Sequence, residues 1–184
     1  MRYTSDEFDL PFELMREHSK RNILRLTRWV GNDPRRLASL MELVLNGEIT
    51  VARRASWVMS VCIEYAPSLA GPWIRPLFNI LSDDRSHPAI MRNAMRSLQF
   101  VDIPSRSRGR IVDLCISILR SVRSEIAVQA YAMTVLHNVV VKEPDLRDEI
   151  ILVIEPLLEF GTAGVRSRAR KVLKGLKALK PRRI

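Results

Sequence analysis

Three arginines and a tryptophan recur at a spacing that would place them side by side. Arg53 and Trp57 are four residues apart, as are Arg92 and Arg96, and the second pair follows the first by 39 residues. Side chains four residues apart lie on one face of a helix. Arginine and aromatic side chains are enriched at protein contacts, and aromatic rings also stack on the bases of nucleic acids. These four residues are therefore candidates for holding a peptide or a base.

Familiar catalytic and cofactor motifs are absent from the sequence. It contains no GxGxxG, GxxxxGK[ST], HExxH or GxSxG pattern, which would indicate nucleotide, zinc or serine chemistry. The three histidines, His18, His87 and His137, are scattered. Cys62 and Cys115 form no CxxC motif and have no histidine at ligand spacing. We expect no catalysis, no cofactor, no metal site and two buried, reduced thiols.

One helical pattern recurs four times along the chain. The segments 51–62, 90–101, 128–139 and 165–176 each have alanine at the fifth position, and these alanines are 39, 38 and 37 residues apart: Ala55, Ala94, Ala132 and Ala169. Apolar residues stand four before, four after and seven after each alanine, which is the spacing of one helix face. A small residue at the centre of that face lets a neighbouring helix approach closely. The pattern predicts four equivalent helices with buried alanines.

Each unit has room for a partner helix before the alanine helix. The segments 34–45, 72–81, 110–119 and 146–160 keep helical spacing, and a proline follows each alanine helix: Pro67, Pro104, Pro144 and Pro181. Pro76 and Pro156 fall inside partner helices and should bend them. Residues 19–31 look like the second helix of a further unit, with its partner around residues 7–18. No alternating strand pattern competes with this interpretation.

The predicted fold is all-α, with four to five antiparallel helix pairs stacked as an α-solenoid. Helix pairs that repeat every 37 to 39 residues are typical of this architecture. We expect a single domain over residues 1–184, in units of about 7–31, 34–67, 72–104, 108–144 and 146–181.

The repeat pattern resembles HEAT-like (armadillo-type) repeats over residues 19–180. The resemblance rests on the period, the V/I-x-x-x-A-x-x-V-L core and the proline-bent first helices. The stretches RRASWVMS, RNAMRSLQFVDIP, AMTVLHN and FGTAGVRSRARKVL are similar to a group of small bacterial HEAT-like proteins without an established activity. The resemblance implies that the second helices line one concave surface.

Residues two before, two after and five after each alanine should point away from the core. Ser60 is one of these outward residues. Others of them are predicted to form a binding surface: Arg53, Trp57, Arg92, Arg96, Gln99, His137, Lys171 and Lys174. Trp57 has two interpretations. It is an anchor on that surface, or it packs beside an N-terminal helix.

The net charge of +10 is concentrated at the C-terminus. All 20 acids precede residue 165 and nine of the 30 bases follow it, so residues 1–164 carry 21 − 20 = +1. The stretch 165–179 has an apolar stripe opposite a basic side, as a terminal repeat helix requires. The basic side would also suit an anionic partner, and both roles stay open.

These observations favour a non-catalytic binding or scaffold module for a protein partner. An array that follows DNA would spread its bases over several units. The alternative is a nucleic-acid-binding protein, because HEAT-like solenoids include alkylpurine DNA glycosylases with a basic concave groove; no acidic residue here matches a catalytic position. No apolar run approaches the roughly 18 residues of a membrane span, and the acidic N-terminus is unlike a signal peptide. We therefore expect a cytoplasmic protein. The sequence does not predict its oligomeric state.

Overall fold

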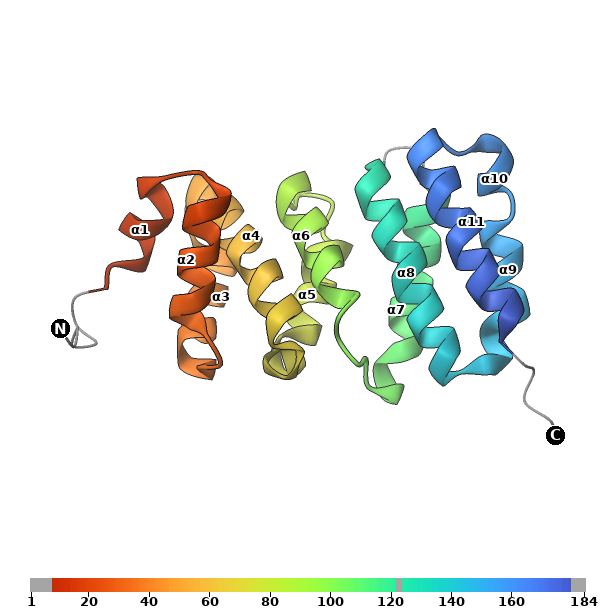
Figure 1. Ribbon diagram of the computed structural model, residues 1–184, viewed down its shortest axis with the longest axis horizontal. Coiled ribbons are helices and arrows are strands. Elements are labelled where there is room, and N and C mark those ends of the chain that lie inside the picture. Colours follow the sequence, from red (N-terminus) through yellow and green to blue (C-terminus); the bar gives the residue numbers. More distant parts are fainter. Residues whose placement is uncertain (1–7, 122–123, 180–184) are drawn as a thin grey trace.

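The protein is a row of helix pairs (Figure 1). The computed structural model describes residues 8–121 and 124–179, and every regular element within these ranges is helical. In the view of Figure 1 the second helices of the last three pairs lie in front of the first, whereas the first two helices of the chain lie side by side. The predicted all-α solenoid is confirmed.

The first two pairs begin at side-chain caps. They consist of α1 (Leu10–Arg16) and α2 (Lys20–Val30), then α3 (Pro34–Asn46) and α4 (Ile49–Tyr65). Asp9, Ser19 and Asp33 each accept a hydrogen bond from a backbone N–H of the following first turn. Such caps satisfy donors that have no partner inside the helix. The Asp-Pro sequence therefore starts α3 where the pattern indicated.

The later pairs are less regular. They comprise the 3₁₀ turn η1 (Pro67–Trp73), α5 (Ile74–Ser82), α6 (Pro88–Leu98), α7 (Ser105–Arg120), α8 (Ile126–Lys142), η2 (Pro144–Leu146), α9 (Arg147–Ile154), α10 (Leu157–Phe160) and α11 (Ala163–Ala178). Pro156 separates α9 from α10, as expected of a proline inside a helix. The prediction that Pro76 lies inside a helix and bends it is wrong. This proline stands in the first turn of α5, where backbone N–H groups have no partner inside the helix.

The core lies between the first and second helices of each pair and along the seam between successive second helices. α2, α4, α6, α8 and α11 pack against one another in chain order, and α4, α6 and α8 also pack on the first helix of their own pair. Ala55, Ala94, Ala132 and Ala169 are all completely buried there. The central prediction from the sequence is thus confirmed. We call the surface formed by α2, α4, α6, α8 and α11 the second-helix face.

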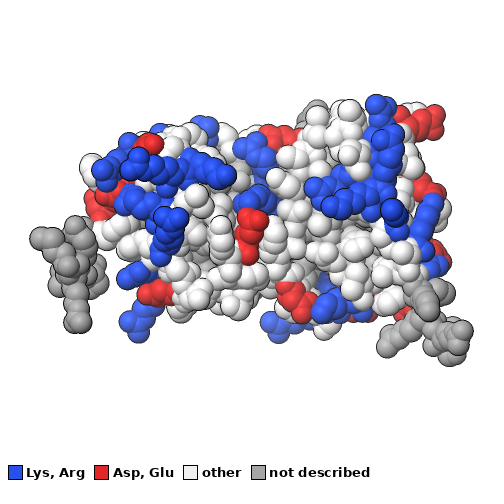
Figure 2. Space-filling model, in the orientation of Figure 1, with Lys and Arg blue, Asp and Glu red and all other residues white. Residues whose placement is uncertain are grey.

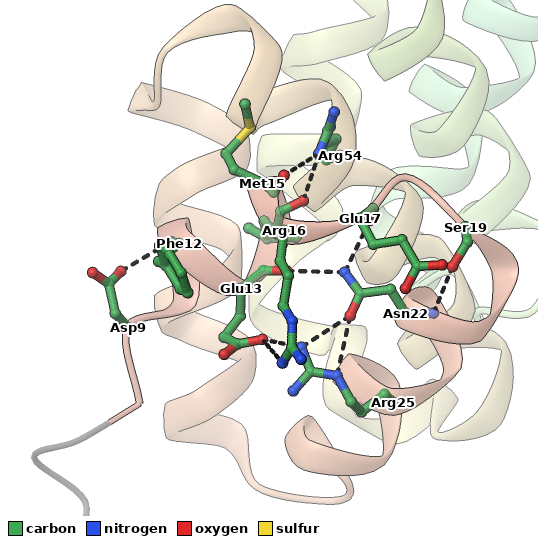
Figure 3. Close-up of polar contacts among 11 residues, drawn as sticks. Asp9, Phe12, Glu13, Met15, Arg16, Glu17, Ser19, Asn22, Arg25 and Arg54 are labelled. Atoms are coloured by element: carbon green, nitrogen blue, oxygen red, sulfur yellow. Dashed lines mark hydrogen bonds and ion pairs between the residues drawn. The ribbon is translucent and has the colours of Figure 1, made fainter.

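Polar contacts attach the N-terminal helix to the rest of the array (Figure 3). Nη1 of Arg54 donates hydrogen bonds to the carbonyl oxygens of Leu14, at 3.0 Å, and Met15, at 2.9 Å. The side-chain amide of Asn22 donates to the carbonyl oxygens of Glu13 and Glu17. These bonds satisfy carbonyl groups at the end of α1. They fix α1 against both α2 and α4.

The last helix has the two sides predicted for it. Its apolar stripe is buried and consists of Val165, Ala169, Val172, Leu173 and Leu176, with Leu179 half-buried beyond it. Arg170, Lys171, Lys174 and Lys177 are exposed on the other side. Pro181, which was expected to end the last unit, lies outside the described residues, as do the bases at positions 180, 182 and 183.

Both cysteines are buried thiols. Burial raises the pKa of Cys62 to about 11 and raises the pKa of Cys115 far above its ordinary value. Within residues 8–121 and 124–179 no three His, Cys, Asp or Glu side chains are grouped to hold a metal ion. No helix in the same ranges has the length and apolar character needed to cross a membrane.

Candidate functional site

Four of the predicted residues line one hollow on the second-helix face. The hollow has a volume of about 510 Å³. α4 contributes Arg53 and Trp57, and α6 contributes Arg92 and Arg96. Each pair is four residues apart on its helix, so the two rows of side chains face the same space. The complete lining is His18, Thr50, Arg53, Arg54, Trp57, Ala89, Arg92, Asn93, Arg96 and Tyr131.

Two of the arginines are held by carboxylates at the edge of the hollow. Nη1 of Arg92 lies 3.2 Å from a carboxylate oxygen of Glu125. Arg96 pairs with Glu64, and its Nη1 donates a 2.8 Å hydrogen bond to the hydroxyl of Ser60. Both acids are exposed at the surface. These contacts orient the two guanidinium groups and partly neutralise them.

The other two arginines have no carboxylate partner among the described residues. The guanidinium of Arg53 is exposed and makes no hydrogen bond or ion pair with any described residue. Within the described part of the chain, Arg54 donates to the two backbone carbonyls at the end of α1 and to nothing else. The residues that line the hollow include no aspartate or glutamate. The site therefore has an excess of positive charge.

Trp57 both packs against the N-terminal part of the chain and lines the hollow. Its ring is half-buried and meets the ring of His18 edge-on, with ring centroids 5.3 Å apart. His18 belongs to the connection between α1 and α2. The tryptophan thus packs beside the N-terminal helices while one part of it lines the hollow.

The floor of the hollow contains residues that the sequence interpretation missed. Asn93 is buried and donates a 2.9 Å hydrogen bond to the hydroxyl of Ser56. Arg54, Asn93 and Tyr131 share one place in the pattern, directly before the alanine of each unit. Arg168 has the same place in the last unit and donates to the hydroxyl of Thr134 at 2.9 Å. Aligning the four units on their alanines shows this position in the sequence, so the same alignment could have identified these residues.

The remaining predicted residues lie apart from the hollow. Gln99 lines a different pocket, of about 290 Å³, beside Phe100 and Val141. His137 is half-buried against Gly175 of α11, and the exposed Lys171 and Lys174 lie on α11.

Ser60, which was expected to point outward, is completely buried. Arg96 of the following unit reaches over it and donates to its hydroxyl.

Charge on the second-helix face is uneven. Figure 2 shows lysine and arginine side chains gathered over the N-terminal part and over the C-terminal helices, with carboxylates among the basic groups near the middle. A ligand with a long run of negative charge would meet both signs along this face. The hollow itself suits an anion, because guanidinium groups bind planar or tetrahedral oxyanions with paired hydrogen bonds.

Comparison with known proteins identifies the repeat. A family model described as a HEAT repeat domain matches residues 11–176. Neither the curated proteins nor the solved structures give a match to this chain.

Proposed function

The chain belongs to the HEAT repeat family, and on this premise we propose that it is a non-catalytic binding module that holds a protein partner on its second-helix face. Stacked helical repeats create extended surfaces that bind other molecules. The observation that carries the proposal is the hollow between α4 and α6, where Arg53 and Trp57 are available for contact. Tryptophan and arginine dominate the binding energy of many protein interfaces.

The ion pairs beside the hollow favour a protein over a nucleic acid. Glu64 and Glu125 are exposed carboxylates next to Arg96 and Arg92. A nucleic-acid backbone that crossed the face would bring phosphates close to both acids, and like charges repel. A protein surface presents charges of both signs, so it can pair with the arginines and avoid the acids.

Nucleic acid binding is the second candidate, and one observation supports it. Trp57 lies beside the unpaired guanidinium of Arg53 on α4, an arrangement that can stack a base and hold its phosphate. Excision of an alkylated base would further require an acidic group near the base. The lining of the hollow supplies none.

Affinity capture from the native cell tests the protein proposal. The bait is the full chain, compared with the double variant Arg53→Ala/Arg92→Ala and with Arg75→Ala, which removes an exposed arginine of α5 that does not line the hollow. Partners are identified by mass spectrometry and their affinities measured by calorimetry. We expect the double variant to weaken binding at least tenfold and Arg75→Ala to leave it unchanged.

Two results would contradict the protein proposal. One is equal capture by the wild type and the double variant. The other is micromolar or tighter binding to duplex or single-stranded DNA that weakens steeply with salt and is reduced by Arg92→Ala/Arg96→Ala. The second result would establish nucleic acid binding instead.

A further inference from the structure

The hollow and the acids at its edge carry a net charge of about +2. Four guanidinium groups line it, from Arg53, Arg54, Arg92 and Arg96, and the lining has no carboxylate. Two of the four are paired with Glu125 and Glu64 at the edge. Subtracting two acids from four bases leaves two positive charges. A single carboxylate would neutralise one of them, whereas a phosphate monoester carries a charge of about −1.5 to −2 at pH 7.

The unpaired guanidinium groups have donors to spare. Arg53 makes no polar side-chain contact with any described residue, so all its N–H groups are available. Arg54 uses Nη1 for the carbonyls of α1, and its Nε and Nη2 donate to no described residue. A guanidinium presents its donors in a planar fork that matches two oxygens of a phosphate. Adjacent arginines of this kind are the usual means of recognising phosphorylated side chains.

The hollow has room for the group that carries the phosphate. Its volume of about 510 Å³ falls within the range of about 300 to 1,000 Å³ that is usual for ligand sites. Trp57, Tyr131 and His18 give it aromatic walls beside the arginines.

The edges of the hollow limit the ligand to an isolated dianion. Glu64 stands on α4 beyond Arg96, and Glu125 stands at the start of α8 beyond Arg92. A chain of phosphates that continued out of the hollow past either arginine would meet one of these carboxylates.

We infer that this hollow is the binding site for a phosphorylated side chain of the protein partner, with Arg53 and Arg54 holding the phosphate dianion and Trp57 contacting the group that bears it. The inference rests on the proposed function and names the chemistry of the partner. It requires no catalytic step.

A titration with phenyl phosphate tests the site without any partner. The full-length chain has three tryptophans, so its nuclear magnetic resonance spectrum contains three indole N–H signals, and Trp57→Phe identifies one of them. We expect phenyl phosphate to shift the Trp57 signal and to saturate. Benzoate, which has the same ring and a single negative charge, should bind at least tenfold more weakly.

Arginine variants show whether the phosphate occupies the hollow. Arg53→Ala removes an exposed side chain that has no polar partner among residues 8–121 and 124–179, so the variant should fold normally. It should weaken phenyl phosphate binding at least tenfold, and Arg75→Ala should not. An unshifted Trp57 signal, equal affinity for benzoate, or equal effects of the two variants would overturn the inference.

Phosphatase treatment of the captured partner separates this inference from the proposed function. Capture that depends on Arg53 and is lost after phosphatase treatment supports both. Capture that depends on Arg53 but survives phosphatase overturns the phosphate inference and leaves the proposed function standing. Phenyl phosphate binding with no partner captured overturns the proposed function and assigns the hollow to a small phosphorylated molecule. A single-stranded oligonucleotide that displaces phenyl phosphate at far lower concentration, with a steep salt dependence, overturns both.

Discussion

Asn93 donates a 2.9 Å hydrogen bond from its side-chain amide to the hydroxyl of Ser56, across the seam between α6 and α4. Both side chains are buried. The hydroxyl in turn donates to the carbonyl oxygen of Arg53 at 2.8 Å, so the hydroxyl of this buried pair is satisfied. The bond lies beneath the arginines of the hollow and joins two successive repeats.

Removing that amide should destabilise the array. Asn93→Ala leaves the Ser56 hydroxyl buried without its donor, and such a loss costs about 1–3 kcal/mol. The free energy of unfolding is measured by urea titration. Asn46→Ala is the control, because Asn46 is exposed and bonds only to Glu42 on the surface, which predicts a change below about 0.5 kcal/mol. Equal losses in the two variants would mean that the cross-seam bond has no special role.

Enlarging an alanine of the seam should also destabilise the fold. Ala132 is completely buried between neighbouring helices, so Ala132→Leu forces them apart at a cost of about 1–3 kcal/mol. Ala178→Leu, at the exposed end of α11, should stay within about 0.5 kcal/mol. Thermal unfolding compares the two variants. An unchanged melting temperature for Ala132→Leu would show that the seam is loosely packed.

The sequence predicted the features that depend on one helix at a time. The period of apolar residues fixes which side of a helix is buried, and the alanines of the four units obey it without exception. Pro156 breaks its helix for an equally local reason. Ser60 was placed wrongly, because its burial depends on a long side chain, Arg96, that reaches it from the next repeat. Helical period alone carries no information about such a reach.

The candidate site also depends on how neighbouring repeats lie against each other. Arg53 and Trp57 meet Arg92 and Arg96 because adjacent repeats bring equivalent columns together. Lys171 occupies the same column as Trp57 but stands three units further along, so it cannot share the hollow.

Arg54 was missed for a different reason. The columns predicted to face outward are those two before, two after and five after each alanine, and the column directly before the alanine, where Arg54 stands, is not among them.

The free energy of unfolding should depend on the Cys62 thiol at alkaline pH. Burial raises its pKa from 9.0 to about 11 in the folded state. Above pH 9 the unfolded chain loses this proton while the folded chain keeps it, so stability falls as the pH rises toward 11. The stability difference between wild type and Cys62→Ala, measured in urea at pH 8 and pH 10, should shrink by about 1 kcal/mol. A constant difference would contradict a protonated thiol in the folded state.

Arg54→Ala should loosen the N-terminal helix while leaving the later repeats intact. The variant loses both hydrogen bonds to the carbonyls of Leu14 and Met15, each of which contributes about 1 kcal/mol. Hydrogen exchange of the α1 amides should accelerate about thirtyfold, the equivalent of about 2 kcal/mol, whereas exchange in α8 and α11 should not change. Arg53→Ala is a matched control, since the Arg53 side chain makes no hydrogen bond or ion pair with the described residues of α1. Uniform acceleration along the chain would indicate global destabilisation instead.

Gly175 and His137 should be energetically coupled across the last seam. A Cβ atom added at Gly175 would stand 2.7 Å from Nε2 of His137, closer than real side chains allow. Alanine favours a helix over glycine by about 1 kcal/mol, so Gly175→Ala should approach this gain only when His137→Ala has cleared the space. In the wild-type background the clash should cancel the gain or reverse it. A double-mutant cycle in urea should give a coupling of about 0.5–3 kcal/mol. Equal effects of Gly175→Ala in both backgrounds would contradict the coupling and show that the His137 ring moves aside at little cost.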